Sequence, residues 1–416
     1  MSGPGDRLEL IATYVADLPA ERTREAAESF ATGQSIGTWL PVPGITDEMR
    51  QRHGARVLEV TQHPVGAEPG GEPLGGRWLL RVAFAAENFG ASFPMILTTL
   101  VGNDPSTSQS VRLLDVELDD AFQRQFPGPR LGIEGWRRIT GVWERPLLLN
   151  MIKPCTGYSP SVGADLLELP ARGGADLIKD DELLADAPFN RVAERTRAYR
   201  ARLERVAEET GHRARYICNV SDRAARLLDT ARAAVDGGAD ALMVNALVVG
   251  LDALQSLAEA NLGVPILIHT AAAEVFTGAV ASGIGQAVLF GKLLRLAGAD
   301  SVFTTTPFAR RPPPRAVYDL GIEWMREPRG HLLPTMPMVA GGVHEGMIEP
   351  LIEHAGVDVI LGVGGAIQGH PDGATAGTRA IRAAIDRTVA NLRSTGRLVG
   401  NTGSGDRPGA GAPAAG

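Results

Sequence analysis

Of the 41 lysine and arginine residues in the chain, only Lys153, Lys179 and Lys292 are lysines. Lysine can lose its proton and act as a nucleophile or as an acid and base, whereas arginine stays charged. A chain that uses arginine for almost every positive charge retains lysine where arginine cannot replace it. Lys153 and Lys179 each fall at the end of a predicted strand, which indicates chemistry. Lys292 falls within a predicted helix, where we expect a solvated side chain.

Three acidic residues, Asp180, Asp181 and Glu182, follow Lys179 directly. Carboxylate oxygens and water are the ligands that Mg²⁺ prefers in octahedral coordination. The same run would also suit the start of a helix, where acidic side chains face the positive end of the dipole. Because Lys153 lies on the neighbouring predicted strand, we favour a Mg²⁺ site over a helix start.

Further candidate site residues follow later strands. His269 ends the fifth strand of a regular series, and the pairs Gly341–Gly342 and Gly364–Gly365 follow the seventh and eighth. Paired glycines expose backbone N–H groups, and barrel enzymes commonly bind phosphate with these two loops. Each signal alone also fits a structural histidine or an ordinary turn. Together, at strand ends, they predict a substrate site.

The part of the chain after Pro146 alternates regularly between strands and helices. Predicted strands lie at 146–152, 175–179, 215–220, 239–245, 264–269, 300–305, 334–340 and 357–363. Amphipathic helices are predicted at 189–210, 223–236, 251–261, 283–297 and 375–392. Eight strand–helix units over about 250 residues predict a (β/α)₈ TIM barrel, which we assign to 141–395, with catalytic groups at the strand C-terminal ends. A doubly wound sheet is the competing α/β architecture.

Residues 1–140 lack this regular alternation. Strands are predicted at 8–15, 55–61, 78–84 and 111–116, a helix around Phe30 and a turn cluster at 64–76, whereas 93–100 fits either a helix or a strand. Such a mixture predicts an N-terminal α+β domain. At the other end, the Gly-, Ala- and Pro-rich stretch 396–416 is predicted to be a disordered tail.

Composition narrows the possible partners. The net charge is −7 and no basic stripe with interleaved aromatic residues is present, so we expect no nucleic-acid partner. Two cysteines, Cys155 and Cys218, cannot form a disulfide framework, which is typical of a reducing cytosol. The first residues lack the charged and apolar regions of a signal peptide, and the apolar runs are too short to cross a bilayer. We therefore expect a cytoplasmic protein with no membrane partner.

The chain resembles the RuBisCO large-chain family from about residue 8 to 395. The matching segments are GTW (37–39), VGN (101–103), FPGPRLGIEG (126–135), RPLL (145–148), IKP (152–154), GGADLIKDDE (173–182), LIHTA (267–271), AGG (340–342), GG (364–365) and GHP (369–371). The resemblance implies a ferredoxin-like α+β domain followed by a C-terminal (β/α)₈ barrel. This agrees with the pattern of predicted strands and helices.

The resemblance also implies roles for the candidate site residues. CO₂ would carbamylate Lys179, and the carbamate, Asp181 and Glu182 would bind Mg²⁺. Lys153 matches an acid/base lysine, and His269 matches a histidine that handles protons on the substrate hydroxyls.

The family's site is completed by a second subunit and includes a phosphate site. Thr38, Trp39 and Asn103 match residues of the N-terminal domain that complete a neighbouring subunit's site, so a homodimer or a multiple of dimers is implied. Thr38 and Trp39, with Gly342, Gly364 and Gly365, also match the first phosphate site.

Other family positions are changed. An arginine that helps to hold a second phosphate is Thr270, and a histidine after the sixth strand is Phe303. The mobile lysine of true carboxylases has at best Arg310 as its counterpart, in a loop that prolines stiffen. A glutamate that pairs with that lysine is Gly33, and a second lysine after IKP is Cys155.

These retained and lost residues resemble those of a RuBisCO-like protein of the form IV type. The implied activity is that of a Mg²⁺-dependent lyase or isomerase. It would enolise, isomerise or decarboxylate a phosphorylated keto-sugar or sugar-acid derivative through an enediolate. A true ribulose-bisphosphate carboxylase and a non-catalytic regulatory or scaffold protein remain alternatives. The first needs Arg310 to replace the loop lysine, and the second leaves the retained site residues without a purpose.

Overall fold

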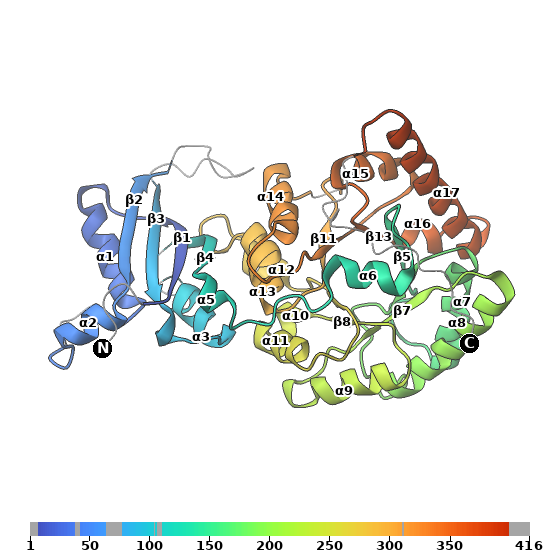
Figure 1. Cartoon of the computed structure of the whole chain (residues 1–416), viewed down its shortest axis with the longest axis horizontal. Coiled ribbons are helices and arrows are strands. Elements are labelled where there is room, and N and C mark those ends of the chain that lie inside the picture. The colour runs from blue at the N-terminus through green and yellow to red at the C-terminus, as the bar shows by residue number, and fades with distance from the viewer. Residues whose placement is uncertain are drawn as a thin grey trace, which may run out of the picture.

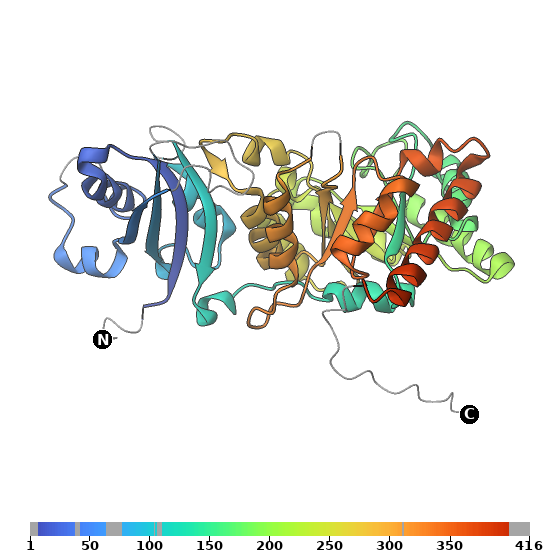
Figure 2. The same ribbon diagram turned by 90° about the horizontal axis from the view of Figure 1, so that it is seen from above.

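The computed structural model describes residues 7–37, 42–63, 77–103, 105, 110–309 and 312–398. An N-terminal sheet domain lies at one end of an elongated molecule and an α/β barrel at the other (Figures 1 and 2). No helix in these residues is long and apolar enough to cross a membrane.

The N-terminal domain is built on a five-stranded sheet with the order β10-β4-β1-β3-β2. Its strands are β1 (Glu9–Asp17), β2 (Arg56–Gln62), β3 (Arg77–Ala85), β4 (Val111–Leu118) and β10 (Gly283–Ile284). The helical elements are η1 (Ala20–Arg22), α1 (Thr23–Gly33), α2 (Asp47–His53), η2 (Ala86–Asn88), α3 (Phe93–Leu97), η3 (Thr98–Gly102) and α5 (Asp120–Gln123). Alternate β1 residues turn inward, and Tyr14 packs edge-on against Phe30 of α1 with ring centroids 5.4 Å apart. The segment 93–100, which fitted either a helix or a strand, is helical.

The predicted helix at 283–297 is wrong at its start. Gly283 and Ile284 form β10, which pairs in parallel with Arg112 and Leu113 of β4. Only then does the chain become helical, in η4 (Val288–Leu293) and α13 (Leu294–Ala297). A glycine at φ +88° permits this bend, and the free edge of β4 supplies the partner that the sequence could not reveal.

The barrel is closed and parallel, as the alternation predicted. Its strands are β5 (Leu147–Met151), β6 (Leu177–Lys179), β7 (Arg215–Asn219), β8 (Ala241–Val244), β9 (Ile266–Ile268), β11 (Ser301–Thr305), β12 (Met336–Ala340) and β13 (Ile360–Val363). Each falls within one predicted segment, and β13 pairs with β5 to close the ring. The competing doubly wound sheet is therefore excluded.

Helices surround the barrel. They are α6 (Gly132–Thr140), α7 (Pro160–Arg172), α8 (Val192–Thr210), α9 (Ala224–Asp236), α10 (Ala246–Val249), α11 (Leu251–Glu259), α12 (Ala273–Thr277), α14 (Arg315–Arg326), η5 (Glu345–Met347), α15 (Ile348–Ala355), α16 (Gly365–Gln368) and α17 (Gly373–Ser394). Trp136 of α6 is fully buried against the apolar side chains that fill the barrel, such as Leu147 and Met336. The predicted tail lies, from residue 399 on, outside the described residues.

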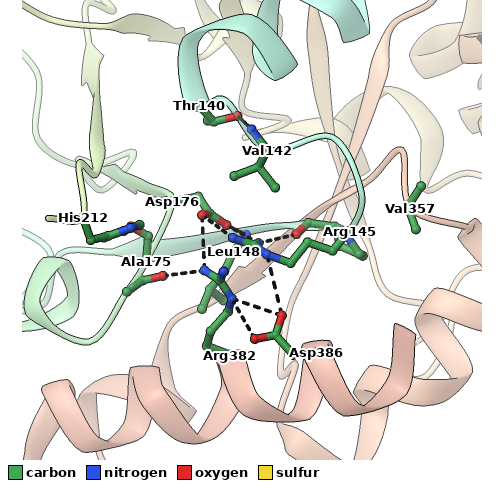
Figure 3. Close-up of polar contacts among 12 residues, drawn as sticks. Thr140, Val142, Arg145, Leu148, Ala175, Asp176, His212, Val357, Arg382 and Asp386 are labelled. Atoms are coloured by element: carbon green, nitrogen blue, oxygen red, sulfur yellow. Dashed lines mark hydrogen bonds and ion pairs between the residues drawn. The ribbon is translucent and has the colours of Figure 1, made fainter. Parts of the chain in front are cut away.

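The N-terminal end of the barrel is held by buried ion pairs. Arg145, before β5, donates to both carboxylate oxygens of Asp176, before β6, at 2.6 and 2.7 Å. Arg382 of α17 reaches the same carboxylate at 3.4 Å and pairs with Asp386 (Figure 3). The first strands and the last helix are thus joined at this end, which leaves the opposite end available for chemistry.

The prediction of a solvated Lys292 is wrong. Its side chain is buried in η4, forms an ion pair with Asp115 of β4 and donates to the Val116 carbonyl at 3.1 Å. The ammonium also lies 4.1 Å from the centroid of the Trp324 ring. Lys292 therefore joins the barrel to the N-terminal sheet.

Candidate active site

The candidate catalytic residues meet at the carboxyl-terminal rim of the barrel. Lys153 Nζ lies 2.6 Å from Asp181 Oδ2, and Lys179 Nζ lies 3.8 Å from Glu182 Oε2. His269 Nε2 is 3.5 Å from the same oxygen of Glu182. Parallel strands end at one rim, which is why residues from β5, β6 and β9 converge.

Lys179 is the most enclosed of these groups. Its side chain is 1% exposed, and its amine donates to the carbonyl of Asp180 at 2.9 Å. Burial lowers the pKa of Lys179 below its usual value, although the nearby acidic groups oppose this. A lowered pKa favours the neutral amine, which is the form that reacts with CO₂.

Lys153 and Asp181 form a tight ion pair. Burial alone would lower the pKa of Lys153, but its hydrogen bonds to Asp181 and to the Cys155 sulfur outweigh burial and raise that pKa. Burial would likewise raise the pKa of Asp181, but the hydrogen bonds from Lys153 and from the Leu183 amide outweigh it and lower that pKa. In this arrangement Lys153 is an ammonium group and Asp181 a carboxylate.

His269 is packed against an aromatic ring. Its imidazole stacks on Phe303 with centroids 4.9 Å apart and planes 22° apart. Burial, followed by the charge of Lys179, lowers the pKa of His269 to about 4, so the ring is neutral near pH 7. Its Nδ1 atom is buried and has no hydrogen-bond partner in the described chain. The position that would carry a second histidine is therefore an apolar support for His269.

The donor set fits a divalent cation only if Lys179 is modified. Among the described residues, no three His, Cys, Asp or Glu side chains form a group that could hold a metal ion. Asp181 and Glu182 supply carboxylates, and the amine of Lys179 lies 3.8 Å from Glu182. A carbamate on Lys179 would supply the missing anionic oxygen, and burial of its amine lowers the pKa of Lys179, which favours the neutral form that carbamylation needs.

Asp180, the remaining member of the acidic run, faces away from the rim. It is fully buried, and its Oδ2 accepts hydrogen bonds from the Tyr216 hydroxyl at 2.7 Å and from the Asn219 amide at 2.9 Å. It also pairs with Arg195 of α8 at 3.1 Å. Asp180 is therefore a structural anchor.

Two asparagines that sequence reasoning did not single out support the acidic run. Asn219 Nδ2 donates to the backbone carbonyls of Asp181 and Glu182, both at 3.2 Å. Asn245 Nδ2 donates to the same backbone carbonyl of Glu182 at 3.1 Å. Each follows or ends a barrel strand, so the strand-end rule that selected the lysines could have found them.

The glycine pairs lie on adjacent loops of the same rim. Gly341 and Gly342 have φ of +94° and +80°, a region in which other residues are strained. Gly364 and Gly365 begin α16, whose Gln368 donates to Asn150 of β5 at 2.7 Å. Among the described residues, the backbone amides of these four glycines donate no hydrogen bond.

Of the three residues expected from the N-terminal domain, the structure describes only Asn103. Asn103 follows η3 in the sheet domain. Thr38, Trp39 and Arg310 lie outside the described residues.

A sheet domain followed by a closed barrel with a lysine–carboxylate rim defines a class of two-domain α/β-barrel proteins. The family model for the ribulose bisphosphate carboxylase large chain, catalytic domain, matches residues 132–310 and 320–399, and that for the N-terminal domain matches residues 4–122. The chain belongs to the ribulose bisphosphate carboxylase large-chain family.

Individual relatives are similar over nearly the whole chain. A ribulose bisphosphate carboxylase-like protein of Archaeoglobus fulgidus is 39% identical over 383 residues, covering 91% of this chain and 87% of the relative. A 2,3-diketo-5-methylthiopentyl-1-phosphate enolase of Geobacillus thermodenitrificans is 36% identical over 395 residues, 94% of each chain. The structure of a rubisco-like protein from Alicyclobacillus acidocaldarius superposes with a TM-score of 0.83 at 30% identity, covering 93% of this chain and 95% of that one.

The buried imidazole generates a prediction about acid stability. Because the pKa of His269 is lowered on folding, the unfolded chain binds a proton between about pH 6.5 and pH 4 and the folded chain does not. The contribution of His269 to stability is therefore complete above pH 6.5 and is lost as the pH falls towards 4. We expect a loss of up to about 3 kcal/mol over this interval. The His269→Gln variant should not show this pH-dependent loss of stability.

The measurement is the pH dependence of unfolding for both proteins, with the His269 ring followed by NMR. A ring that protonates near pH 6.5 in the folded protein would contradict the prediction.

Proposed function

We propose that the chain is a Mg²⁺-dependent, RuBisCO-like enolase that acts on a phosphorylated keto-sugar derivative. One observation carries this proposal: Lys153, Lys179, Asp181, Glu182 and His269 converge on one rim. The first substrate to test is 2,3-diketo-5-methylthiopentyl 1-phosphate, because the Geobacillus relative is named for it.

Asp181, Glu182 and carbamylated Lys179 would hold the cation. Bound Mg²⁺ would supply positive charge that polarises a substrate carbonyl and disfavours the protonated form of Lys153. The barrel interior beneath the rim is filled by apolar side chains, which would keep water away from that side of a bound substrate.

Proton transfer falls to Lys153 and His269. Lys153 is 38% exposed on its side chain, so a substrate at the rim can reach its amine. With the cation bound, the neutral amine of Lys153 or the carbamate on Lys179 would take the proton from the carbon next to the carbonyl, and the protonated group would return it in the reverse direction. His269 is neutral and has one ring nitrogen beside Glu182, so it can exchange a proton with a substrate hydroxyl. Both groups keep fixed positions because Asp181 and Phe303 hold them.

One phosphate would bind between the glycine pairs. The free amides of Gly341, Gly342, Gly364 and Gly365 suit an anion, and β12 and β13, which precede them, are neighbours in the barrel. A monophosphate therefore fits the rim.

The part of the rim formed by β9 and β11, next to β12, does not favour a bisphosphate. Thr270 is buried, and its hydroxyl donates to the Phe303 carbonyl at 3.3 Å, while the Phe303 ring covers His269. Neither side chain offers a charge to a second phosphate. This supports enolisation over carboxylation of a bisphosphate.

The site is proposed to be shared between two copies of the chain. The loops and helices after β6, β8 and β9 carry exposed apolar side chains: Leu183 is 67%, Val248 63% and Val275 82% exposed. Apolar side chains gathered on one functional face are typical of an interface. Asn103 sits in the sheet domain, so a second copy would bring it to this rim.

The metal site can be tested with Asp181→Asn. Asparagine keeps an acceptor for the Leu183 amide, and Lys153 can turn to solvent, so the free energy of unfolding should change by no more than about 1–2 kcal/mol. Loss of the charge should abolish Mg²⁺-dependent C–H exchange of the diketo phosphate in D₂O.

Asp240→Asn is the control, because Asp240 is also a largely buried, ion-paired aspartate, with a side chain 12% exposed against 1% for Asp181, but lies before β8, at the opposite end of the barrel. It should retain exchange. Unchanged turnover in Asp181→Asn would refute the assignment of Asp181 as a Mg²⁺ ligand.

The carboxylase alternative has its own test. We expect no incorporation of labelled CO₂ from ribulose 1,5-bisphosphate at high Mg²⁺ and bicarbonate, because neither Thr270 nor Phe303 offers a charge to a second phosphate. The Lys179→Ala variant gives the background level of label incorporation. Incorporation above that background would show that Thr270 and Phe303 do not exclude the bisphosphate.

The shared site predicts a dimer in solution. Light scattering at micromolar concentration should give twice the mass of the chain, and Val275→Glu should shift it towards the monomer and lower activity. Leu169→Glu, at an exposed leucine near the end of α7 and therefore towards the opposite end of the barrel, serves as a surface control. A fully active wild-type monomer would rule the shared site out.

A further inference from the structure

Behind the proposed metal site lies an ion pair with no solvent exposure. Arg195 of α8 and Asp180 are both 0% exposed, and an Nη atom of Arg195 lies 3.1 Å from Asp180 Oδ2. Arg195 Nε donates to the Tyr216 hydroxyl at 3.0 Å, and that hydroxyl donates to Asp180 Oδ2 at 2.7 Å. The Asp180 carboxylate thus contacts both Arg195 of α8 and Tyr216 of the neighbouring strand β7.

The same arginine also holds the loop that follows the acidic run. Its other terminal nitrogen donates to the carbonyls of Asn190 at 2.8 Å and Ala185 at 3.1 Å. A planar guanidinium with five donors can serve all these acceptors at once, whereas an ammonium cannot. Arg195 therefore joins β7, the loop at 185–190 and Asp180 into one rigid unit.

Asp180 is the link between this unit and the reactive amine. Successive side chains of an extended chain alternate in direction, so Lys179 and Asp181 face the rim while Asp180 faces α8. The carbonyl of Asp180 is the acceptor for the buried Lys179 amine, at 2.9 Å. Anchoring the Asp180 side chain therefore fixes the peptide group that holds Lys179.

We propose that Arg195 and Asp180 are positioning residues: their ion pair sets the geometry in which Lys179 reacts with CO₂ and Asp181 and Glu182 bind Mg²⁺. This rests on the proposed function. The pair touches neither substrate nor cation, so it acts only through the segment Lys179–Glu182.

The test replaces both partners, because removing Arg195 alone would leave a buried charge without a partner and destabilise the whole fold. The variant is Arg195→Met with Asp180→Asn, which keeps both shapes approximately and removes both charges. The matched control is Arg145→Met with Asp176→Asn, a buried pair of the same type at the other end of the barrel (Figure 3). Arg195→Lys, which keeps the charge and loses the planar fork, is the second variant if the first does not fold.

Three readouts separate positioning from stability. They are the carbamate signal in ¹³C NMR with labelled bicarbonate, the Kd for Mg²⁺ by calorimetry in bicarbonate, and the thermal midpoint without metal. We expect the Arg195 variants to lose carbamate signal and to weaken Mg²⁺ binding by about 10- to 100-fold, the usual effect of removing a residue that supports metal ligands. The control pair should lower the thermal midpoint but leave Mg²⁺ affinity within about twofold of wild type.

The outcomes are distinguishable. Wild-type protein without carbamate or Mg²⁺ binding would refute the proposed function and this proposal with it. Wild-type binding that is equally weakened by both pairs, or by neither, would overturn only the positioning role of Arg195 and Asp180.

Discussion

Closure of the eight-stranded parallel sheet is the constraint on which the candidate site depends. When β13 pairs with β5, the last strand lies beside the first, and residues 153, 179 and 269 are brought to one rim. At the opposite end of the barrel, Arg145, Asp176 and Arg382 form a buried network that joins the first strands to the last helix. The candidate catalytic residues lie at the other end, where the strand carboxyl termini meet.

Burial and pairing give the two rim lysines opposite character. Burial of Lys179 outweighs the charges of its acidic neighbours, so its pKa falls. Lys153 is partly exposed and donates to Asp181 at 2.6 Å, so its pKa rises. Titratable groups whose environments push their pKa values apart are typical of sites with divided roles. His269, between Glu182 and Phe303, is a third titratable group, and its lowered pKa keeps it neutral near pH 7. One rim therefore holds the Lys179 amine with a lowered pKa, the Lys153 ammonium group and a neutral imidazole.

Changes from the family pattern are accommodated by packing. Phe303 stacks on His269, and the Thr270 hydroxyl is used by a backbone carbonyl. Loss of a charged side chain at either position would leave neighbouring polar groups without a partner, but here the Phe303 ring packs on His269 and the Thr270 hydroxyl has an acceptor. Under the proposed function, this part of the rim would face a ligand that carries no second phosphate.

The sequence by itself determined the alternation of strands and helices, and hence the closed barrel, because each strand is an apolar run short enough to be bounded by turn residues. It also placed Lys153, Lys179, Asp181, Glu182 and His269 at strand ends, since position along a strand is a local property. The parts that it missed depend on partners distant in the chain. Lys292 is buried because Asp115, 177 residues away, comes to meet it, and Gly283 is a strand residue because β4 offers an edge. Asp180 differs from its neighbour Asp181 only because α8 places Arg195 behind it. Local pattern specifies which side chains are available, but only packing between distant segments decides which of them are neutralised, anchored or left free to react.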